Sequence, residues 1–489
     1  MRDPAHTRPN ILLLCSDQHH ARMAGYRGHA EVKTPSLDRL ASEGVHFTRS
    51  YCNTPICGPS RISFMTGREL HELGLWCNGV PWNGKAMTWA DRLGQAGYRT
   101  LSRGKMDVPG PRTDVGFSDF DEPIPRPACD PYPLSEPRIY DQPDFHFDSF
   151  MDLPHAGMSR EARLRMEGRD PMTLTTRFEE NLYLTGHYDH DRHVVDQVLS
   201  FLRGDHRDTP WALHVGLLNP HWPYVCPEAF LAQYDPAALA LPQDSRFPNP
   251  DLHPALQHYQ GTHNHYQTIR DETHLRQIIA AYYGLITCMD SMVGEIMDCL
   301  AEQDLAGETC LIYTSDHGEA CGEHGLFDKL TAYEASAAVP LIVRGPGLKR
   351  GVRCDEIVSL VDLYPTILDL AGIELSPAEK ALPGRSWVPL LQGLKQARTD
   401  PILIEYHGIF FRHHWFALVE GDWKFVWYEK ERPSLFNLRE DPHELHDLGA
   451  DPARVSLLSE FESKLRSRVD PEAVVRLARR ELGWRDGGR

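Results

Sequence analysis

The sequence has no long apolar run and is short of basic residues. No stretch approaches the ~20 apolar residues of a membrane-spanning helix, and the N-terminal run ILLLC is too short for the apolar part of a secretory signal. The 489 residues include 51 Lys and Arg against 69 Asp and Glu, a net charge of -18. Because phosphate backbones require basic surface, this balance argues against a nucleic-acid partner. We expect no membrane association and a cytoplasmic location, with the periplasm left open.

Close cysteine pairs are also missing. The chain has 11 cysteines, none of them in a Cys-x-x-Cys motif, which argues against a zinc ribbon or a thioredoxin-type site. There is no internal repeat and no low-complexity tract. Apolar residues make up 41% and charged residues 25%, so a sizeable folded core is expected.

Short apolar runs alternate with helical patterns along most of the chain. This alternation predicts an α/β fold with a doubly wound, mainly parallel sheet. Several of the runs end in polar residues, at Asp17, Lys105, His221, Asp316 and His317. Ligands bind at the carboxyl ends of parallel strands, so these five side chains are expected to meet at one edge.

The alternation of apolar runs and helical patterns changes near residue 386, which divides the chain into two parts. We predict a catalytic α/β domain over residues 1–385, interrupted by insertions at about 121–190 and 243–271. Residues 386–489 alternate like antiparallel strands and end in a helical pattern, which predicts a smaller C-terminal subdomain. The histidines of the second insertion lack the tight spacing of a zinc site, so we expect a solvated lid loop there.

Two acidic strand ends predict a metal site. Asp17 and Asp316 offer hard carboxylate ligands, Gln18 adds a neutral oxygen, and His317 adds a softer nitrogen. Calcium is the first choice, with manganese or magnesium as alternatives. Read singly, each pair would more often cap a helix or a turn.

The string Cys57-Gly58-Pro59-Ser60-Arg61 places a thiol before a helical pattern. Pro59 suits the first helical position, so Cys57 is expected at the positive end of that helix, with Arg61 one turn on. This arrangement favours an anion site that contains a nucleophile. The alternative is a buried structural cysteine.

The same string resembles the Cys-x-Pro-Ser-Arg signature of type I sulfatases, members of the alkaline phosphatase superfamily. The resemblance covers most of the chain and includes TPSLDRLASEGVHFTRSYCNTP, GYRTLSRGK, NPHWPY, TSDHGEACGEHG and SLFNLREDPHELHDL. The middle and end look most like arylsulfatase K. Phosphonate monoester hydrolases and choline sulfatases are more distant kin. The fold implied is a large mixed, mostly parallel sheet between helices, with a smaller C-terminal antiparallel sheet plus helix.

The resemblance implies that Cys57 is oxidised to formylglycine by dedicated formylglycine-generating machinery. One hydroxyl of the hydrated aldehyde would attack sulfur and displace the alcohol, and loss of the proton from the second would expel sulfate. The family's single metal would be held by Asp17, Gln18, residue 57, Asp316 and His317. The remaining site residues implied are Arg61 beside the hydrate, Lys105, His221 and Lys329 around the sulfate and the leaving oxygen, and, more weakly, Asn78 near the anion.

Each of these residues also has an ordinary interpretation. A lysine such as Lys105 or Lys329 is more often a solvated surface residue, and His221 fits a turn as well as a catalytic position. Many sulfatases carry histidine where this chain has Asp107. Asp107 fits a general acid with a raised pKa, a contact to a substrate hydroxyl, or a turn cap equally well.

These observations predict a hydrolase for a small anionic sulfate ester, such as a 2-sulfated uronate of a glycan. The alternatives at the same site are phosphonate or phosphate monoester hydrolysis and aryl or choline sulfate hydrolysis. A two-metal phosphatase would need Ser or Thr at position 57, and a binding protein would not need the intact set of polar residues. A homo-oligomer stays open.

Overall fold

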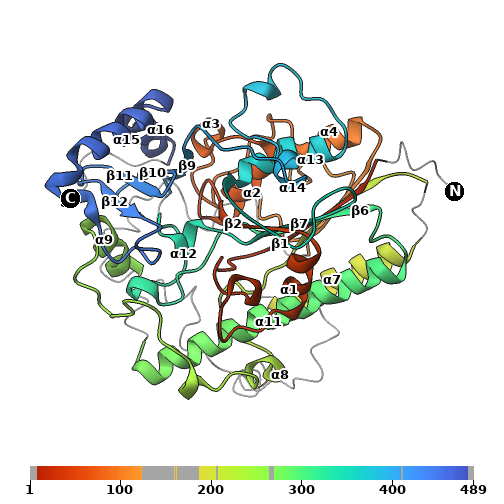
Figure 1. Cartoon of the computed structure of the whole chain (residues 1–489), viewed down its shortest axis with the longest axis horizontal. Helices are drawn as coiled ribbons and strands as arrows, with labels where there is room; N and C mark the ends of the chain where they lie inside the picture. Colours follow the sequence, from red (N-terminus) through yellow and green to blue (C-terminus); the bar gives the residue numbers. More distant parts are fainter. Residues whose placement is uncertain are drawn as a thin grey trace.

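The computed structural model describes residues 8–123, 159, 161, 187–204, 208–263, 269–408 and 411–482. Most of the first predicted insertion therefore lies outside the described residues. The main element is an eight-stranded mixed sheet of order β4-β3-β5-β1-β6-β7-β2-β8 (Figure 1). Its strands are β1 (Asn10–Ser16), β2 (Val45–Tyr51), β3 (Arg99–Gly104), β4 (Asp119–Asp121), β5 (Trp211–Gly216), β6 (Thr309–Ser315), β7 (Leu341–Arg344) and β8 (Val352–Ser359).

The direction of the strands brings the predicted site residues to one edge. β1 pairs in parallel with β5 and β6, and β3 pairs in parallel with β4 and β5. β7 is antiparallel to both β6 and β2, so it runs against the other strands. The mixed, mostly parallel sheet is confirmed, with β7 as its antiparallel strand.

Successive side chains of the strands pack into two apolar cores, one on each face of the large sheet. On β1, Leu12 and Leu14 pack into one core with α1 (Pro35–Glu43), α7 (His187–Arg203) and α11 (Glu272–Glu302). Ile11 and Leu13 face the other core, which contains α2 (Cys57–Thr66), α4 (Trp89–Gln95) and α13 (Leu363–Leu370). Because successive strand residues point to opposite faces, a continuously apolar strand such as β1 becomes buried on both sides.

The C-terminal part forms a second, smaller sheet. Its antiparallel order is β12-β11-β10-β9, with strands β9 (Ile402–Tyr406), β10 (Trp415–Glu420), β11 (Trp423–Tyr428) and β12 (Ser434–Asn437). The helices α15 (Val455–Arg468) and α16 (Pro471–Glu481) lie beside it (Figure 1). The short α14 (Val388–Leu391) packs instead in the core of the large sheet, through Leu390 and Leu391. The division of the chain at about 385 stays a prediction.

Short helices complete the described part of the chain. They are α3 (Leu70–Leu73), α8 (Glu228–Leu231), α9 (Pro254–His263) and α12 (Glu334–Ala337). The helix α9 falls in the segment expected to be a lid loop, so that expectation was wrong for these residues. Leu256 and Tyr259 of α9 pack against the C-terminal sheet in a third apolar core, and this burial stabilises the helix although its sequence pattern is weak.

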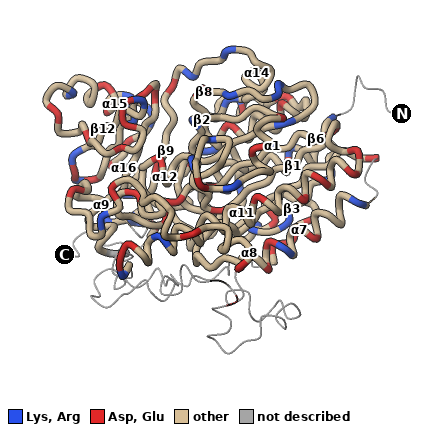
Figure 2. Tube along the Cα trace, turned by 60° about the horizontal axis from the view of Figure 1, so that its bottom comes forward, with Lys and Arg blue, Asp and Glu red and all other residues tan. Residues whose placement is uncertain are grey.

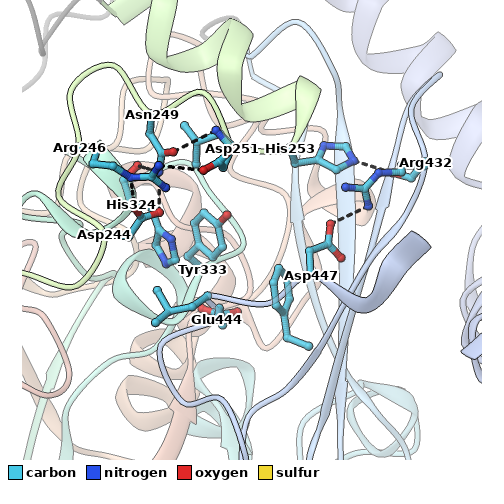
Figure 3. Close-up of a pocket in the computed structure, with 13 residues that line it drawn as sticks. Asp244, Arg246, Asn249, Asp251, His253, His324, Tyr333, Arg432, Glu444 and Asp447 are labelled. Atoms are coloured by element: carbon cyan, nitrogen blue, oxygen red, sulfur yellow. Dashed lines mark hydrogen bonds and ion pairs between the residues drawn. The ribbon is translucent and has the colours of Figure 1, made fainter. Parts of the chain in front are cut away.

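A polar cavity of about 390 Å³ lies between the second insertion, the segment after β6 and the C-terminal part (Figure 3). His324 stacks on Tyr333 in its lining, with ring centroids 4.0 Å apart. Several charged groups around it form ion pairs, as between Arg432 and Asp447 at 2.6 Å and between Arg246 and Asp251 at 2.8 Å. Figure 2 shows Lys and Arg interspersed with Asp and Glu over the described part of the chain. No helix among the described residues is both long enough and apolar enough to cross a bilayer.

A buried lysine joins the C-terminal sheet to the segment before α12. Lys424 of β11 is fully buried and lies 2.7 Å from Glu334 and 2.8 Å from Glu444. The same ammonium donates to the carbonyl of Ala332 at 2.8 Å. The buried carboxylate of Glu444 and the partly buried carboxylate of Glu334 therefore share one cation.

We expect Lys424→Met to destabilise the protein by about 3–5 kcal/mol, because it leaves the buried Glu444 and the partly buried Glu334 without this counterion. Lys464→Met is the matched control, since Lys464 makes comparable pairs with Glu420 and Glu460 but is about one-third exposed. The control should lose under about 1 kcal/mol. Urea unfolding of both variants measures the difference, and equal losses would contradict this account.

Candidate active site

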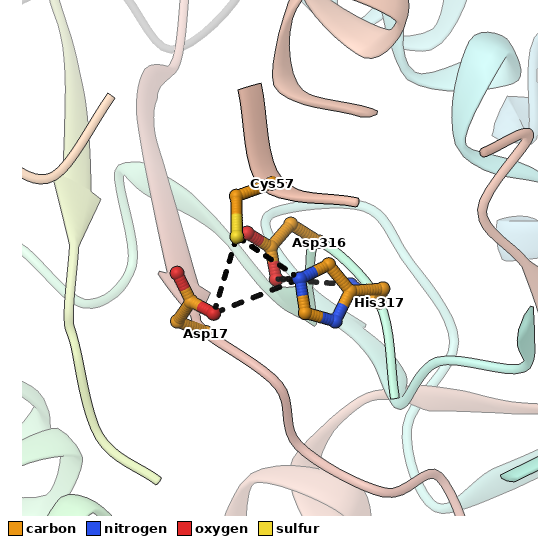
Figure 4. Close-up of side chains that lie close together, drawn as sticks. All are labelled: Asp17, Cys57, Asp316 and His317. Carbon is orange, nitrogen blue, oxygen red and sulfur yellow. Dashed lines mark hydrogen bonds and ion pairs between the residues drawn. The ribbon is translucent and has the colours of Figure 1, made fainter. Parts of the chain in front are cut away.

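The metal site predicted from two strand ends forms as a buried cluster. Asp17 and Asp316 follow β1 and β6, which pair side by side, so their side chains start from the same edge. One ligand atom each from Asp17, Cys57, Asp316 and His317 lies within 4.8 Å of the others, and all four side chains are buried (Figure 4). The imidazole Nε2 of His317 is 3.7 Å from Asp17 Oδ1 and 3.5 Å from Asp316 Oδ1.

Cys57 lies in this cluster as the first residue of helix α2. Ile56 is extended, the helix begins at Cys57, and Cys57 is 1% exposed. Pro59 is therefore the third helical residue and not the first, as expected from the sequence. Its missing N–H is still one of the groups that have no partner within a helix, so Pro59 is compatible with this position. The Sγ of Cys57 lies 3.3 Å from His317 Nε2 and 3.8 Å from Asp17 Oδ1.

The guanidinium of Arg61 lies one turn along α2 and contacts the two carboxylates. Its Nε donates to Asp316 Oδ2 at 2.9 Å, and its Nη2 is 3.4 Å from Asp17 Oδ2. Its Nη1 donates to the carbonyl of Lys105 at 2.6 Å. Arg61 is fully buried, and Asp316 contributes most to raising its pKa against the opposing effect of burial. Arg61 thus joins the ends of three strands.

Two lysines bring further positive charge to the cluster. The Nζ of Lys105 is 2.6 Å from Asp17 Oδ2. The Nζ of Lys329 lies 3.3 Å from Cys57 Sγ and donates to Gln18 Oε1 at 2.8 Å. Their exposed fractions are only 9% and 6%, so neither is the solvated surface lysine of the ordinary interpretation.

This charge changes the acidity of the thiol. Burial and the Asp17 carboxylate raise the pKa of Cys57, but Lys105, Lys329 and His317 outweigh them, and the pKa falls to about 6. An unmodified Cys57 would therefore be mainly a thiolate at neutral pH. For Asp17 the balance is similar: burial raises its pKa, but Lys105, His221, Lys329 and Arg61 hold it well below the usual range.

His221 reaches the site from the loop after β5. Its Nδ1 lies 2.5 Å from the carbonyl of Trp222, which fixes the hydrogen on that nitrogen, and its Nε2 faces the Lys329 ammonium at 3.0 Å. Burial, together with the nearby Lys329, lowers the pKa of His221 to about 3. The ring is therefore a neutral acceptor. His187 of α7 stands edge-on to it, with ring centroids 5.6 Å apart.

Asn78 and Asp107 lie beside the first turn of α2. The Oδ1 of Asn78 accepts the backbone N–H of Gly58 at 3.0 Å, so this amide helps to fix the start of the helix. Asp107 is 5% exposed, has a positive φ of 63°, and its Oδ2 is 3.7 Å from Lys105 Nζ. The structure thus brings all the predicted site residues together, while their individual roles stay predictions.

Two glutamates around the site were not singled out from the sequence. Glu319 accepts a hydrogen bond from the Nε2 of Gln18, and it also accepts the N–H groups of Cys321 and Asp328 at 2.7 Å each. Glu122 accepts the N–H groups of Met106 and Asp107 at 2.8 Å each. Glu319 directly follows the Asp-His-Gly motif, and this position could have marked it as a site residue from the sequence. Glu122 borders a proline-rich insertion, and no sequence pattern there marks it as a site residue.

The donor groups fit a divalent cation. The Nδ1 of His317 lies 2.9 Å from the carbonyl of Gly318, so its Nε2 can present a lone pair to the cluster. Glu319 holds the Nε2 of Gln18, which turns the amide oxygen toward the same place. Two carboxylates, an amide oxygen and an imidazole form a mainly oxygen set suited to calcium, magnesium or manganese.

We expect a saturating divalent cation to raise the melting temperature of the protein, and Asp316→Asn to abolish most of that rise. At 100 times the Kd, binding to the folded state alone contributes about 2.7 kcal/mol. Asp290→Asn is the control, because Asp290 is also buried but bonds the N–H groups of Ser36 and Leu37, outside the cluster. An undiminished shift in Asp316→Asn, measured by differential scanning calorimetry with and without chelator, would contradict this assignment.

Comparison with known proteins agrees with the geometry. The family profile described as Sulfatase matches residues 9–373, and that of the C-terminal part of N-sulphoglucosamine sulphohydrolase matches residues 322–470. Choline-sulfatase of Rhizobium meliloti is 30% identical over 91% of this chain and 83% of its own length. Arylsulfatase K of Homo sapiens is 30% identical over 89% of this chain and 78% of its own length.

Solved structures show the same fold. The phosphonate monoester hydrolase of Agrobacterium radiobacter aligns with a TM-score of 0.71 at 23% identity, covering 94% of this chain and 95% of that one. A 2-O GAG sulfatase aligns with a TM-score of 0.72 at 21% identity, covering 98% and 94%. At these identities the likeness supports the fold alone. The family profile and the curated relatives carry the assignment, and they confirm the resemblance that began with five residues at Cys57: the chain belongs to the sulfatase family and is a sulfuric ester hydrolase.

Proposed function

We propose that the protein hydrolyses the sulfate ester of a small sulfated sugar, with residue 57 as the origin of the nucleophile. The observation that carries the proposal is the place of Cys57. Its sulfur lies at the buried N-terminus of α2, 3.3 Å from both Lys329 Nζ and His317 Nε2. A sulfate group next to it would meet cationic donors on several sides, in a site from which water is largely excluded.

Conversion of Cys57 to formylglycine would supply a hydrated aldehyde with two hydroxyls, one to attack sulfur and one to release the sulfate. Cys57 is only 1% exposed in the folded chain. We therefore propose that the generating machinery acts on this segment before the chain folds. The flanking residues Thr54 to Arg61 are buried as well, so the folded protein offers no extended peptide at this point.

Asp17, Gln18, Asp316 and His317, together with residue 57, would hold one divalent cation, with calcium as the first choice. The cation would lower the pKa of a hydroxyl bound to it and orient the sulfate oxygens. Arg61 holds the two carboxylates in place through its 2.9 Å and 3.4 Å contacts.

Lys105, Lys329 and His221 surround the position of the sulfate and its leaving oxygen. The two ammonium groups would neutralise charge that builds on these oxygens in the transition state. His221 accepts from Lys329 through Nε2 and keeps its hydrogen on Nδ1, so it orients Lys329 and carries no proton on the nitrogen that faces the site. The proton for the leaving oxygen then comes from Lys329 Nζ or from Asp107.

We propose a 2-sulfated uronate or a similar glycan fragment as the substrate class. The likeness to arylsulfatase K supports it. A uronate carries a carboxylate beside the sulfate, and the buried lysines give this acidic protein a locally positive site. Matched sulfate, phosphate and phosphonate esters distinguish this substrate class from the phosphonate hydrolase alternative.

We expect Cys57→Ser to transfer one sulfate per site and then stop. The serine oxygen attacks sulfur, the alcohol leaves, and the serine sulfate cannot break down because there is no second hydroxyl. Intact mass should rise by that of SO₃ without turnover, and Cys57→Ala should show neither. Cys354→Ser, at a half-buried position outside the site, should turn over normally. Sustained turnover by Cys57→Ala would exclude this nucleophile.

Asp107→Asn separates the two catalytic roles left open for Asp107. If its carboxyl protonates the leaving oxygen, kcat/KM should fall by 10²–10⁴-fold for sugar sulfates and far less for nitrophenyl sulfate, which needs no acid. If it binds a substrate hydroxyl, the loss should appear mainly in KM and should vanish for a substrate without that hydroxyl. Equal kinetics of variant and parent on every substrate would remove Asp107 from the site.

A further inference from the structure

The turn that carries Lys329 has an unusual backbone. Asp328 and Leu330, its two neighbours, have φ angles of 67° and 75°. Residues with a Cβ rarely adopt this left-handed region, and they keep it only where surrounding contacts compensate. Lys329 stands between them with its ammonium directed to Gln18, Cys57 and His221. The position of this ammonium therefore depends on whatever holds the turn.

Two aromatic side chains hold the carbonyls of this turn. The hydroxyl of Tyr259, on α9, donates to the carbonyl of Lys329 at 2.7 Å. The indole Nε1 of Trp415, on β10, donates to the carbonyl of Leu330 at 3.0 Å. Tyr259 is 1% exposed and Trp415 is fully buried. Buried hydrogen bonds of this kind do not compete with water, so they fix the direction of each carbonyl firmly.

The N–H groups of Asp328 and Leu330 donate to Glu319 and to the segment before Cys57. Leu330 donates to the carbonyl of Pro55, two residues before Cys57, at 3.2 Å. Asp328 donates to Glu319, which also holds Gln18. The turn is therefore fixed between the nucleophile segment and the two aromatic donors.

A single apolar core surrounds these contacts. It contains Leu330 and Tyr333 from the segment after β6, Tyr259 from α9, and Tyr406 and Trp415 from the C-terminal sheet. Figure 1 shows α9 and the C-terminal sheet on the same side of the molecule as α12, which follows the turn. The second insertion and the C-terminal sheet thus meet on the residues that present Lys329.

We propose that Tyr259 and Trp415 are positioning residues, which hold the ammonium of Lys329 against the leaving oxygen of the substrate. This inference rests on the proposed function of Lys329. The C-terminal sheet then acts in catalysis through the Lys329 turn. A displacement near 1 Å at a catalytic group can cost about 100-fold in rate, and Lys329 has contacts of 2.8 to 3.3 Å to lose.

The test is Tyr259→Phe, which removes one hydroxyl and keeps the ring, alongside Trp415→Phe. Activity is normalised to the formylglycine content of each preparation. We expect kcat/KM for a sugar sulfate to fall 10- to 100-fold, mainly through kcat, and to fall less for nitrophenyl sulfate, whose leaving oxygen needs little help. Tyr98→Phe is the matched control, because Tyr98 is also buried and donates to a backbone carbonyl, that of Pro9, far from the turn.

A double-variant cycle with Lys329→Ala decides whether the effect passes through Lys329. If Tyr259 positions Lys329, adding Tyr259→Phe to Lys329→Ala should change kcat/KM by less than twofold. Losses that multiply in the double variant, or a Tyr259→Phe enzyme with parental kinetics, would overturn the inference. If Lys329→Ala alone keeps full activity on sugar sulfates, the role proposed for Lys329 fails instead, and the two failures are told apart.

Discussion

The buried guanidinium of Arg61 is the group on which the site depends. Two fully buried carboxylates, Asp17 and Asp316, have oxygen atoms within 4.8 Å of each other. Two negative charges this close cannot both stay ionised without a compensating positive charge. Arg61 contacts both and also takes the carbonyl of Lys105. The ends of β1, β6 and β3 are thereby joined at one point. A lysine would offer its three donors from a single nitrogen, whereas the planar guanidinium reaches these three acceptors from three different nitrogens.

Several residues with a strained backbone lie in or beside the active site. Gln18, Asp107, Asp328 and Leu330 all have positive φ angles between 63° and 75°, and each is a site residue or the direct neighbour of one. Such residues keep their conformation only where the surroundings over-determine it. Here the surroundings are buried acceptors and donors from distant segments: Glu319 for Gln18 and Asp328, Glu122 for Asp107, Trp415 for Leu330. These contacts fix the backbone beside Lys105 and around Lys329.

Sequence reasoning reached the site through strand ends and one motif. Asp17 and Asp316 were predictable because apolar runs mark buried strands, and parallel strands bring their carboxyl ends to one edge. The start of α2 was misplaced by two residues, since a proline suits any position of the first turn. Helix α9 was missed because packing against the C-terminal sheet stabilises it, and local sequence does not show such packing. Tyr259 and Trp415 were out of reach because they lie 70 and 85 residues along the chain from the carbonyls that they bind.

The central claim is that residue 57 acts as formylglycine in a sulfatase. The most direct measurement is a mass spectrum of the tryptic peptide SYCNTPICGPSR, Ser50–Arg61, from denatured protein made in its native host. The account predicts that Cys57 has lost its thiol and carries an aldehyde in its place. A free thiol at Cys57 in a preparation that still turns over sulfate esters would contradict it, and the nucleophile would then have to be another group.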